Sequence, residues 1–256
     1  MGEKTAAEAF AIGRQIINNP LNQMWSEAIL EIEPIGSDSF NLVWEWHLWD
    51  HLIQDADSTL PNYGVVSEHP ELIDINYGNV GGTQGPGISH ADWMHLNAID
   101  YNTDLDQIVI SSRTMGEIYI IDHSTTTAEA ASHSDGNSGK GGDLLYRWGN
   151  PQNYARGNED DRLLNGQHGI NWIPISYPGG GNLILFNNFY SQSISAVFKL
   201  EPPLDEDGCY DILDNEPFGQ LEPIWIRTES YQSDRQSGAF RLGNGNTIIT
   251  DANSVR

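Results

Sequence analysis

Two histidines, His95 and His168, stand at matching places in this sequence and offer its clearest chemistry. Each comes at the start of a short apolar run, of the kind that forms a β-strand. Because imidazole has an unperturbed pKa of about 6.5, it can act as a nucleophile or carry a proton at neutral pH. We therefore expect the two histidines to share one site.

Polar side chains end the next run after each histidine. Ser111, Ser112 and Arg113 follow His95, and Asn187 and Asn188 follow His168. Guanidinium and amide groups are good donors to anions, so this pattern favours an anionic ligand. The alternative is a purely structural one, in which neighbouring backbone satisfies both histidines in a polar funnel.

The histidines belong to a unit of four short apolar runs that recurs roughly every 70 residues, a pattern typical of propeller blades. The copies cover residues 93–101, 106–113, 117–122 and 143–149, then 167–173, 181–188, 195–201 and 222–228, and then 236–242 and 245–250. In such a blade the first run is the innermost strand. Both histidines should therefore point toward the mouth of a central channel.

The repeats predict an all-β fold, a β-propeller of four-stranded blades. Residues 28–34 and 41–46 match the third and fourth runs, so the sequence begins within a blade. The total is about three blades, whereas closed propellers usually have about 4 to 8. We therefore expect residues 1–256 to be a single domain that is an incomplete propeller. An open sandwich of irregular hairpins is the competing fold.

Three other segments connect these runs. Residues 1–24 form a short helical lead-in. A capping box at Thr5 and Glu8 predicts a helix over 5–17, and Pro20 with the two asparagines before it ends that helix. Residues 50–92, with turn formers such as Gly81-Gly82 and Gly85-Pro86-Gly87, predict a long insertion on one propeller face. Residues 132–142 resemble a phosphate-binding loop but lack its required spacing, and they predict a flexible connection.

A metal site is the competing chemistry. His47 and His51 are four residues apart, with Asp50 and Asp55 nearby, which is a spacing that suits a helix. Residues 44–47 have the pattern of a strand end, where such side chains do not converge. His95 and His168 supply only two ligands, whereas a catalytic zinc takes about three from the protein. The sequence therefore predicts neither a metal nor a cofactor.

Composition limits the partners. The chain has 12 Lys and Arg against 36 Asp and Glu, a formal net charge of −24, so phosphate backbones and anionic membranes should be repelled. No segment approaches the roughly 18 to 20 apolar residues that a membrane span needs. We expect neither nucleic acid nor membrane as a partner. Cys209 is the one cysteine, so no disulfide forms within the chain.

Several ordered motifs resemble the arylsulfotransferase family, whose members do not use a nucleotide sulfate donor. They are residues 93–102, 110–123, 144–151, 166–168 and 244–247, and the resemblance runs from about residue 25 to the end. It implies a six-bladed propeller, periplasmic or secreted, that moves a sulfuryl group from a phenolic sulfate ester to a phenol. It also implies a channel histidine that is transiently sulfated, and small-molecule partners only.

Carried over by position, the resemblance makes His95 and His168 the catalytic residues. We expect Asn97, Arg113, Asn187, Asn188 and Ser237 to bind the substrate. Ser237 stands where a third histidine would correspond, and Phe189 begins a stretch without the arginine of the family. These departures leave an alternative open, a non-catalytic propeller that binds an anionic or aromatic ligand.

Overall fold

The computed structural model describes residues 2–81, 90–205, 208–228 and 232–253, and the chain divides into two compact units. The first unit contains residues 1–95 and 122–144, and the second contains residues 96–121 and 145–256. The predicted turn residues Gly82 and 85–87 lie outside the described part, as do 229–231. No helix within the described ranges is long and apolar enough to cross a membrane.

The first unit is made of short elements and long connections. Strand β1 (Gly2–Thr5) pairs with β2 (Gln23–Ser26), and β3 (Ala28–Ile35) pairs with β4 (Ser39–His47), both antiparallel. The other elements are α1 (Ala6–Ala11), η1 (Leu48–Asp50), β5 (Leu52–Ile53), η2 (Val66–Glu68), β6 (Ile73–Asp74) and α2 (Thr127–Ala130). Strands β3 and β4 are the two runs predicted at the start of the chain.

Helix α1 begins as predicted and ends early. Thr5 caps it through the expected reciprocal contacts with Glu8, which confirms the capping box. The helix ends at Ala11, so the prediction of a helix to residue 17 was wrong. The reason is Arg14, whose buried guanidinium donates to the carbonyl oxygens of Ile16 and Gly78 and holds the chain in an irregular path. Burial lowers the pKa of Arg14 to about 10.

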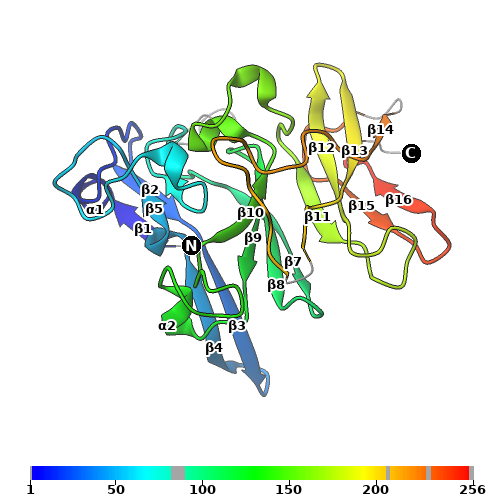
Figure 1. The fold of residues 1–256 in the computed structure, drawn as a ribbon, viewed down its shortest axis with the longest axis horizontal. Coiled ribbons are helices and arrows are strands. Elements are labelled where there is room, and N and C mark those ends of the chain that lie inside the picture. Colours follow the sequence, from blue (N-terminus) through cyan, green and yellow to red (C-terminus); the bar gives the residue numbers. More distant parts are fainter. Residues whose placement is uncertain (1, 82–89, 206–207, 229–231, 254–256) are drawn as a thin grey trace. The chain divides into compact units, whose positions relative to one another are not determined.

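The repeated unit folds as four-stranded sheets in the second unit (Figure 1). One sheet consists of β7 (Leu96–Asn102), β8 (Gln107–Ser112), β9 (Glu117–Asp122) and β10 (Leu144–Trp148). The next consists of β11 (His168–Trp172), β12 (Leu183–Ser191), β13 (Ile194–Leu200) and β14 (Trp225–Thr228), and β15 (Gly238–Arg241) pairs with β16 (Thr247–Thr250). Spatial order follows chain order, which confirms the all-β class and the strand assignment. The closed propeller stays a prediction.

Hydrogen bonds join the first strands of successive copies. The backbone N–H of Trp172 in β11 donates to Asp100 in β7 over 2.8 Å. The amide of Asn171 in β11 donates to the carbonyl oxygen of Ala239 in β15, also over 2.8 Å. The first strands therefore lie side by side, which is the arrangement that the repeat predicts for the innermost strands of neighbouring blades.

Strand β12 is buried on both of its faces. Leu183 and Leu185 belong to a core shared with β8, β9 and β13, whereas Ile184 and Phe186 pack in a second core with Ala239 of β15. Successive side chains of a strand point to opposite faces, so a strand between two layers needs an apolar residue at every position. This explains why the sequence there is a continuous apolar run.

The connections of the second unit include two short 3-10 helices, η3 (Pro151–Tyr154) and η4 (Glu159–Asp161). Asn153 of η3 donates to the carbonyl oxygen of Met115 over 3.1 Å and also to the carboxylate of Glu117. It thereby ties the helix to the turn that joins β8 to β9.

A buried ion pair holds β9 against β10. Arg147 donates through Nε and one terminal nitrogen to the two carboxylate oxygens of Glu117, over 2.9 and 2.6 Å. Both side chains are at most 1% exposed. The hydroxyl of Tyr119 donates to the same carboxylate, and the ring of Tyr154 lies 4.3 Å from the guanidinium. Burial opposes the charge of Arg147, but the attraction of Glu117 keeps the guanidinium pKa above its ordinary value.

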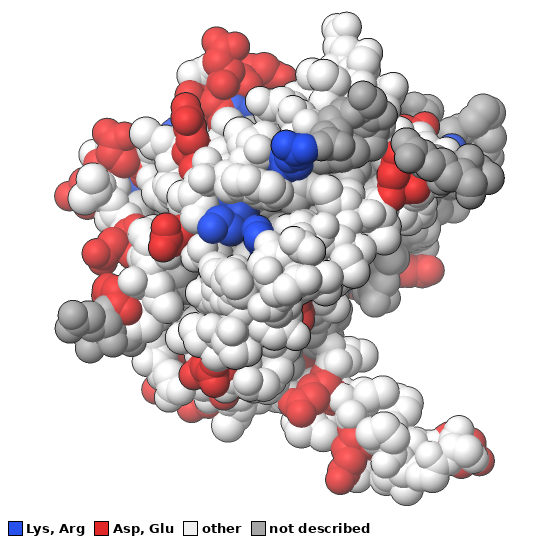
Figure 2. All heavy atoms as spheres, turned by 90° about the vertical axis from the view of Figure 1, so that its right-hand side faces the viewer, with Lys and Arg blue, Asp and Glu red and all other residues white. Residues whose placement is uncertain are grey.

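Acidic side chains dominate the charge of the surface. Figure 2 shows Asp and Glu scattered over the face that it draws, with few Lys or Arg among them. This agrees with the composition of the sequence, which has 36 acidic residues against 12 basic ones.

The ion pair yields a stability prediction. Replacing Arg147→Met leaves Glu117 buried without a counter-charge, and breaking a buried pair in this way costs about 3–5 kcal/mol of unfolding free energy. Urea denaturation measures the loss. The matched control is Arg235→Gln, which removes an exposed pair with Asp234 and should leave the urea midpoint unchanged. A variant of Arg147 as stable as that control would contradict this role.

Candidate active site

His168 opens strand β11 and is held by Asn188 of β12. Its Nδ1 lies 2.8 Å from Oδ1 of Asn188. The amide nitrogen of Asn188 donates to the carbonyl oxygens of Ser233 and Gln236, over 3.0 and 3.1 Å. Asn188 is 1% exposed, so its amide is locked in one orientation.

That orientation settles which nitrogen of His168 carries the proton. Carbonyl oxygens can only accept, so the amide nitrogen of Asn188 must face them and its oxygen must face His168. The hydrogen of the imidazole then lies on Nδ1 and donates to Asn188, and the lone pair lies on Nε2. A neutral imidazole with a fixed Nε2 lone pair is the form that can attack an electrophile or accept a proton.

The segment before β15 lies against the same place. Gly169 has a φ of 65°, and a Cβ there would lie 2.9 Å from the Cα of Gly238 and 3.1 Å from the carbonyl oxygen of Ser237. Only glycine allows this approach. The structure therefore brings the backbone of Ser237 beside the residue that follows His168. The hydroxyl of Ser237 donates to the carbonyl oxygen of Arg235 over 3.1 Å.

Asn97 of β7 joins this group from the neighbouring sheet. Its amide nitrogen donates to the carbonyl oxygen of Gln167 over 2.7 Å. The buried side chain of Gln167 donates in turn to the carbonyl oxygens of Ser112 and Glu117, over 2.8 and 3.0 Å. Asn97, Asn188 and the segment of Ser237 thus surround the start of β11, and Gln167 is the member that the sequence did not indicate.

Arg113 and Asn187 have different surroundings. Arg113 is half-buried in the turn after β8, one residue beyond Ser112, which pairs with Leu96 at the start of β7. Asn187 is fully buried, and it accepts from the backbone N–H of Asn165 and donates to the carbonyl oxygen of Leu163. The oxygen and the nitrogen of the Asn187 amide therefore both hold the loop before β11.

His95 lies in the first unit, directly before β7. It has a φ of 50°, and its backbone N–H donates to Oδ1 of Asp92 over 3.1 Å. Its Nδ1 bonds to the other carboxylate oxygen of Asp92. The proton is again on Nδ1, and Nε2 carries the lone pair of the neutral ring. Asp92 was not predicted, although its spacing of three residues from His95 could have indicated it.

The two histidines reach the same protonation pattern through different partners. Asp92 supplies a carboxylate, which stabilises a positive charge on the ring of His95, whereas Asn188 supplies a neutral amide oxygen to His168. Because His95 and His168 belong to different units, a cavity shared by both stays a prediction.

The histidines of the alternative metal site have separate partners. His47 contacts Glu45 of its own strand over 3.0 Å, whereas His51 is buried and contacts Asp143 over 2.8 Å. The i, i+4 pair is not on a helix: His47 ends β4, and His51 follows η1.

The comparisons with known proteins give one finding. A family model described as Arylsulfotransferase (ASST) matches residues 14–202, which is more than half of the chain. The matched part contains both candidate histidines and ends before Ser237. No curated protein matches the chain.

Nitrogen NMR can test whether Asn188 fixes the tautomer of His168. The expected tautomer in the native protein has its hydrogen on Nδ1, and Asn188→Ala should shift the population toward the Nε2–H form, because it removes the acceptor. Long-range proton–nitrogen correlation spectra distinguish the two forms. Asn187→Ala, which removes the neighbouring buried amide, is the control and should leave the His168 tautomer as it was. A native His168 with its hydrogen on Nε2 would refute the assignment.

Proposed function

We propose, because the chain belongs to the arylsulfotransferase family, that it transfers a sulfuryl group from a phenolic sulfate ester to a phenol. Family membership supports a sulfotransferase-like activity in general. The observation that supports the specific reaction is the hydrogen bonding of the two candidate histidines. Each has an oxygen acceptor at Nδ1, which places the lone pair on Nε2.

The reaction needs a nucleophile that can also leave. In the first step, Nε2 of His95 or His168 attacks the sulfur of the donor, an N–S bond forms, and the S–O ester bond breaks. The electron pair of that bond leaves with the phenolate, which takes up a proton. In the second step, the oxygen of the acceptor phenol attacks the sulfur, loses its proton, and the N–S bond breaks.

The partner of each histidine stabilises the charge that develops. A sulfated imidazole keeps its hydrogen on Nδ1 and carries positive charge on the ring. Asp92 or the amide oxygen of Asn188 stabilises that charge by accepting the hydrogen bond from Nδ1. The sulfuryl oxygens carry negative charge during transfer and need fixed donors. We assign this role to Arg113 and to the second amide hydrogen of Asn97, whose first donates to Gln167, and we assign a substrate contact to the segment of Ser237.

A binding role without turnover is the second candidate. It is favoured by Ser237, which stands at the position where the family would have a third histidine. The hydroxyl of Ser237 donates to the carbonyl oxygen of Arg235. In that case the protein holds an anionic or aromatic ligand at the same residues. We further infer, from the family alone, that the protein works in the periplasm or outside the cell with small-molecule partners.

The transfer assay tests the role of the histidines. The protein should release 4-nitrophenol from 4-nitrophenyl sulfate only when phenol is added, and His95→Ala and His168→Ala should each lower that rate by about 10²- to 10⁴-fold, the usual cost of one catalytic group.

The control is His47→Ala, whose half-exposed side chain contacts Glu45 of its own strand. It should keep the native rate. Equal rates for all three variants would favour a structural role for His95 and His168, and a native protein that binds the ester without releasing 4-nitrophenol would favour the binding role.

A further inference from the structure

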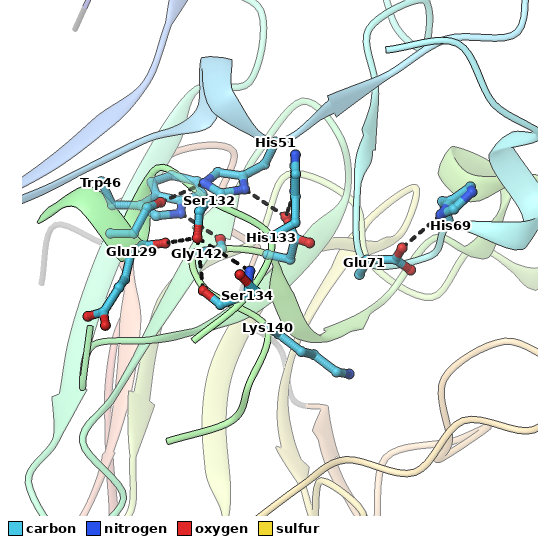
Figure 3. Close-up of polar contacts among 12 residues, drawn as sticks. Trp46, His51, His69, Glu71, Glu129, Ser132, His133, Ser134, Lys140 and Gly142 are labelled. Carbon is cyan, nitrogen blue, oxygen red and sulfur yellow. Dashed lines mark hydrogen bonds and ion pairs between the residues drawn. The ribbon is translucent and has the colours of Figure 1, made fainter. Parts of the chain in front are cut away.

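We propose that His51, His133 and Asp143 bind one divalent transition-metal ion, of the class that zinc represents. One ligand atom from each residue lies within 4.8 Å of the other two (Figure 3). All three residues belong to the first unit. His51 lies between η1 and β5, His133 follows α2, and Asp143 directly precedes β10.

The two imidazoles converge on one carboxylate oxygen. Nδ1 of His51 and Nδ1 of His133 each lie 2.8 Å from Oδ1 of Asp143. The two rings lie close together, with their centroids 5.9 Å apart (Figure 3). Two imidazole nitrogens and a carboxylate oxygen are a donor set that zinc and similar ions take from proteins.

The other nitrogen of His51 identifies the direction of its lone pair. Nε2 lies 2.9 Å from the carbonyl oxygen of Ala130, which can only accept, so the hydrogen of the neutral ring lies on Nε2. Nδ1 then presents its lone pair to the carboxylate of Asp143, and this contact is favourable only with a cation between the two atoms. A proton satisfies that single contact, whereas a divalent ion satisfies all three ligands at once.

This is also how proteins orient a histidine that binds metal. The nitrogen that does not ligate usually donates to a backbone carbonyl or a carboxylate, which fixes the ring and raises its basicity. Ala130 supplies that carbonyl here. The hydrogen bonding of His51 thus matches the support expected around a metal ligand.

The ring of His51 is held rigidly. It is fully buried and stacks on Trp46, with the ring centroids 5.4 Å apart and the planes 4° from parallel. The indole nitrogen of Trp46 donates to the carbonyl oxygen of Gly142 over 2.7 Å. A Cβ at Gly142 would lie 2.0 Å from the carbonyl oxygen of Ala130 and 2.7 Å from Nε2 of His51, so this position requires glycine.

His133 provides the freedom that binding an ion requires. Zinc–ligand bonds of about 2.0–2.2 Å in a tetrahedral site separate the ligand atoms by roughly 3.3 Å, so the contacts to Asp143 must open by about half an ångström. His133 is 60% exposed and can open its own contact by that amount, whereas the contact to the buried His51 must open by a rotation of the Asp143 carboxylate. It also lines a surface pocket of about 380 Å³ with Trp49, Tyr63 and His69, which gives an ion a path from solvent.

Three protein ligands leave one position of a tetrahedral ion for water or a small ligand. The ligand set also excludes the hard cations as preferred occupants. Mg²⁺ and Ca²⁺ take mostly or wholly oxygen ligands, six or more in number, and this cluster has one carboxylate and two nitrogens.

Zinc titration of the full chain tests the proposal. Protein stripped with a chelator and dialysed should take up one Zn²⁺ per chain in competition with a chelating dye, and excess Mg²⁺ or Ca²⁺ should not displace it. His133→Ala should weaken the affinity by at least about 100-fold, since loss of a supporting contact alone costs up to about that factor. His133 is exposed, so this change should not disturb folding.

The matched control is His69→Ala. His69 is half-exposed, contacts a carboxylate oxygen of Glu71 over 2.9 Å, and lines the same pocket, so it matches His133 in residue type, in having a carboxylate partner and in its pocket. This variant should bind Zn²⁺ as the native protein does. Asp143→Asn, which keeps the side-chain size, provides a second variant and should also weaken binding.

Cobalt provides an independent readout. Co²⁺ bound at the site should give visible absorption bands of low-coordinate cobalt with nitrogen ligands, and His133→Ala should remove them. The proposal is overturned if the native chain takes up no stoichiometric Zn²⁺, or if His69→Ala weakens binding as much as His133→Ala. The first result would mean that a proton on His51 serves as the cation in this cluster, and the second would mean that Zn²⁺ binds elsewhere on the chain.

Discussion

The buried pair of Arg147 and Glu117 is the interaction on which the second unit depends. Taking both charges out of water is costly, so the pair is stable only where its geometry is fixed and its remaining donors and acceptors are satisfied. Tyr119 and Asn153 complete that shell around Glu117. The backbone carbonyl of Glu117 then accepts from Gln167, the residue directly before His168. Gln167 thus links the backbone of an ion-pair residue to the start of β11, where the candidate catalytic His168 lies.

The hydrogen-bond partners of the histidines distinguish the candidate active site from the proposed metal site. Each of three histidines has an oxygen at Nδ1, from Asp92 for His95, Asn188 for His168 and Asp143 for His51. The neutral rings of His95 and His168 have their hydrogen on Nδ1, which places the lone pair on Nε2. His51 differs because the carbonyl oxygen of Ala130 takes its Nε2 hydrogen and turns the lone pair of Nδ1 toward a cation. The partner of the second nitrogen decides whether an imidazole is suited to group transfer or to metal binding.

Sequence periodicity predicted the parts of the fold that depend on local pattern. The strands β7 to β16 were predicted from recurring apolar runs, and the runs are longest where a strand such as β8, β9 or β12 is buried on both faces and needs apolar residues at successive positions. The start of α1 was predicted from Thr5 and Glu8. The end of α1 was not, because the bonds of Arg14 reach Gly78, 64 residues away.

The same difference between local pattern and long-range contact explains which parts of the sites the sequence predicted. The matched positions of His95 and His168 indicated a site, whereas the lock on His168 comes from Asn188 and a segment that reaches Gln236, which is a tertiary contact. The contact between His51 and Asp143 joins residues 92 positions apart, and the segment that contains His133 had the pattern of a flexible connection. Spacing along the chain offered His51 possible metal partners only among its neighbours, which the strand pattern of residues 44–47 argued against, and it therefore missed this cluster.

In the proposed reaction the sulfuryl group passes through an imidazole nitrogen. Mass spectrometry can detect this intermediate when the protein is mixed with 4-nitrophenyl sulfate, without an acceptor, and the reaction is then rapidly quenched. We expect a sulfated peptide that contains His95 or His168 and that loses the group when phenol is added before the quench. A sulfated peptide that contains Ser237 instead, or no sulfated peptide while phenol-dependent transfer proceeds, would contradict it.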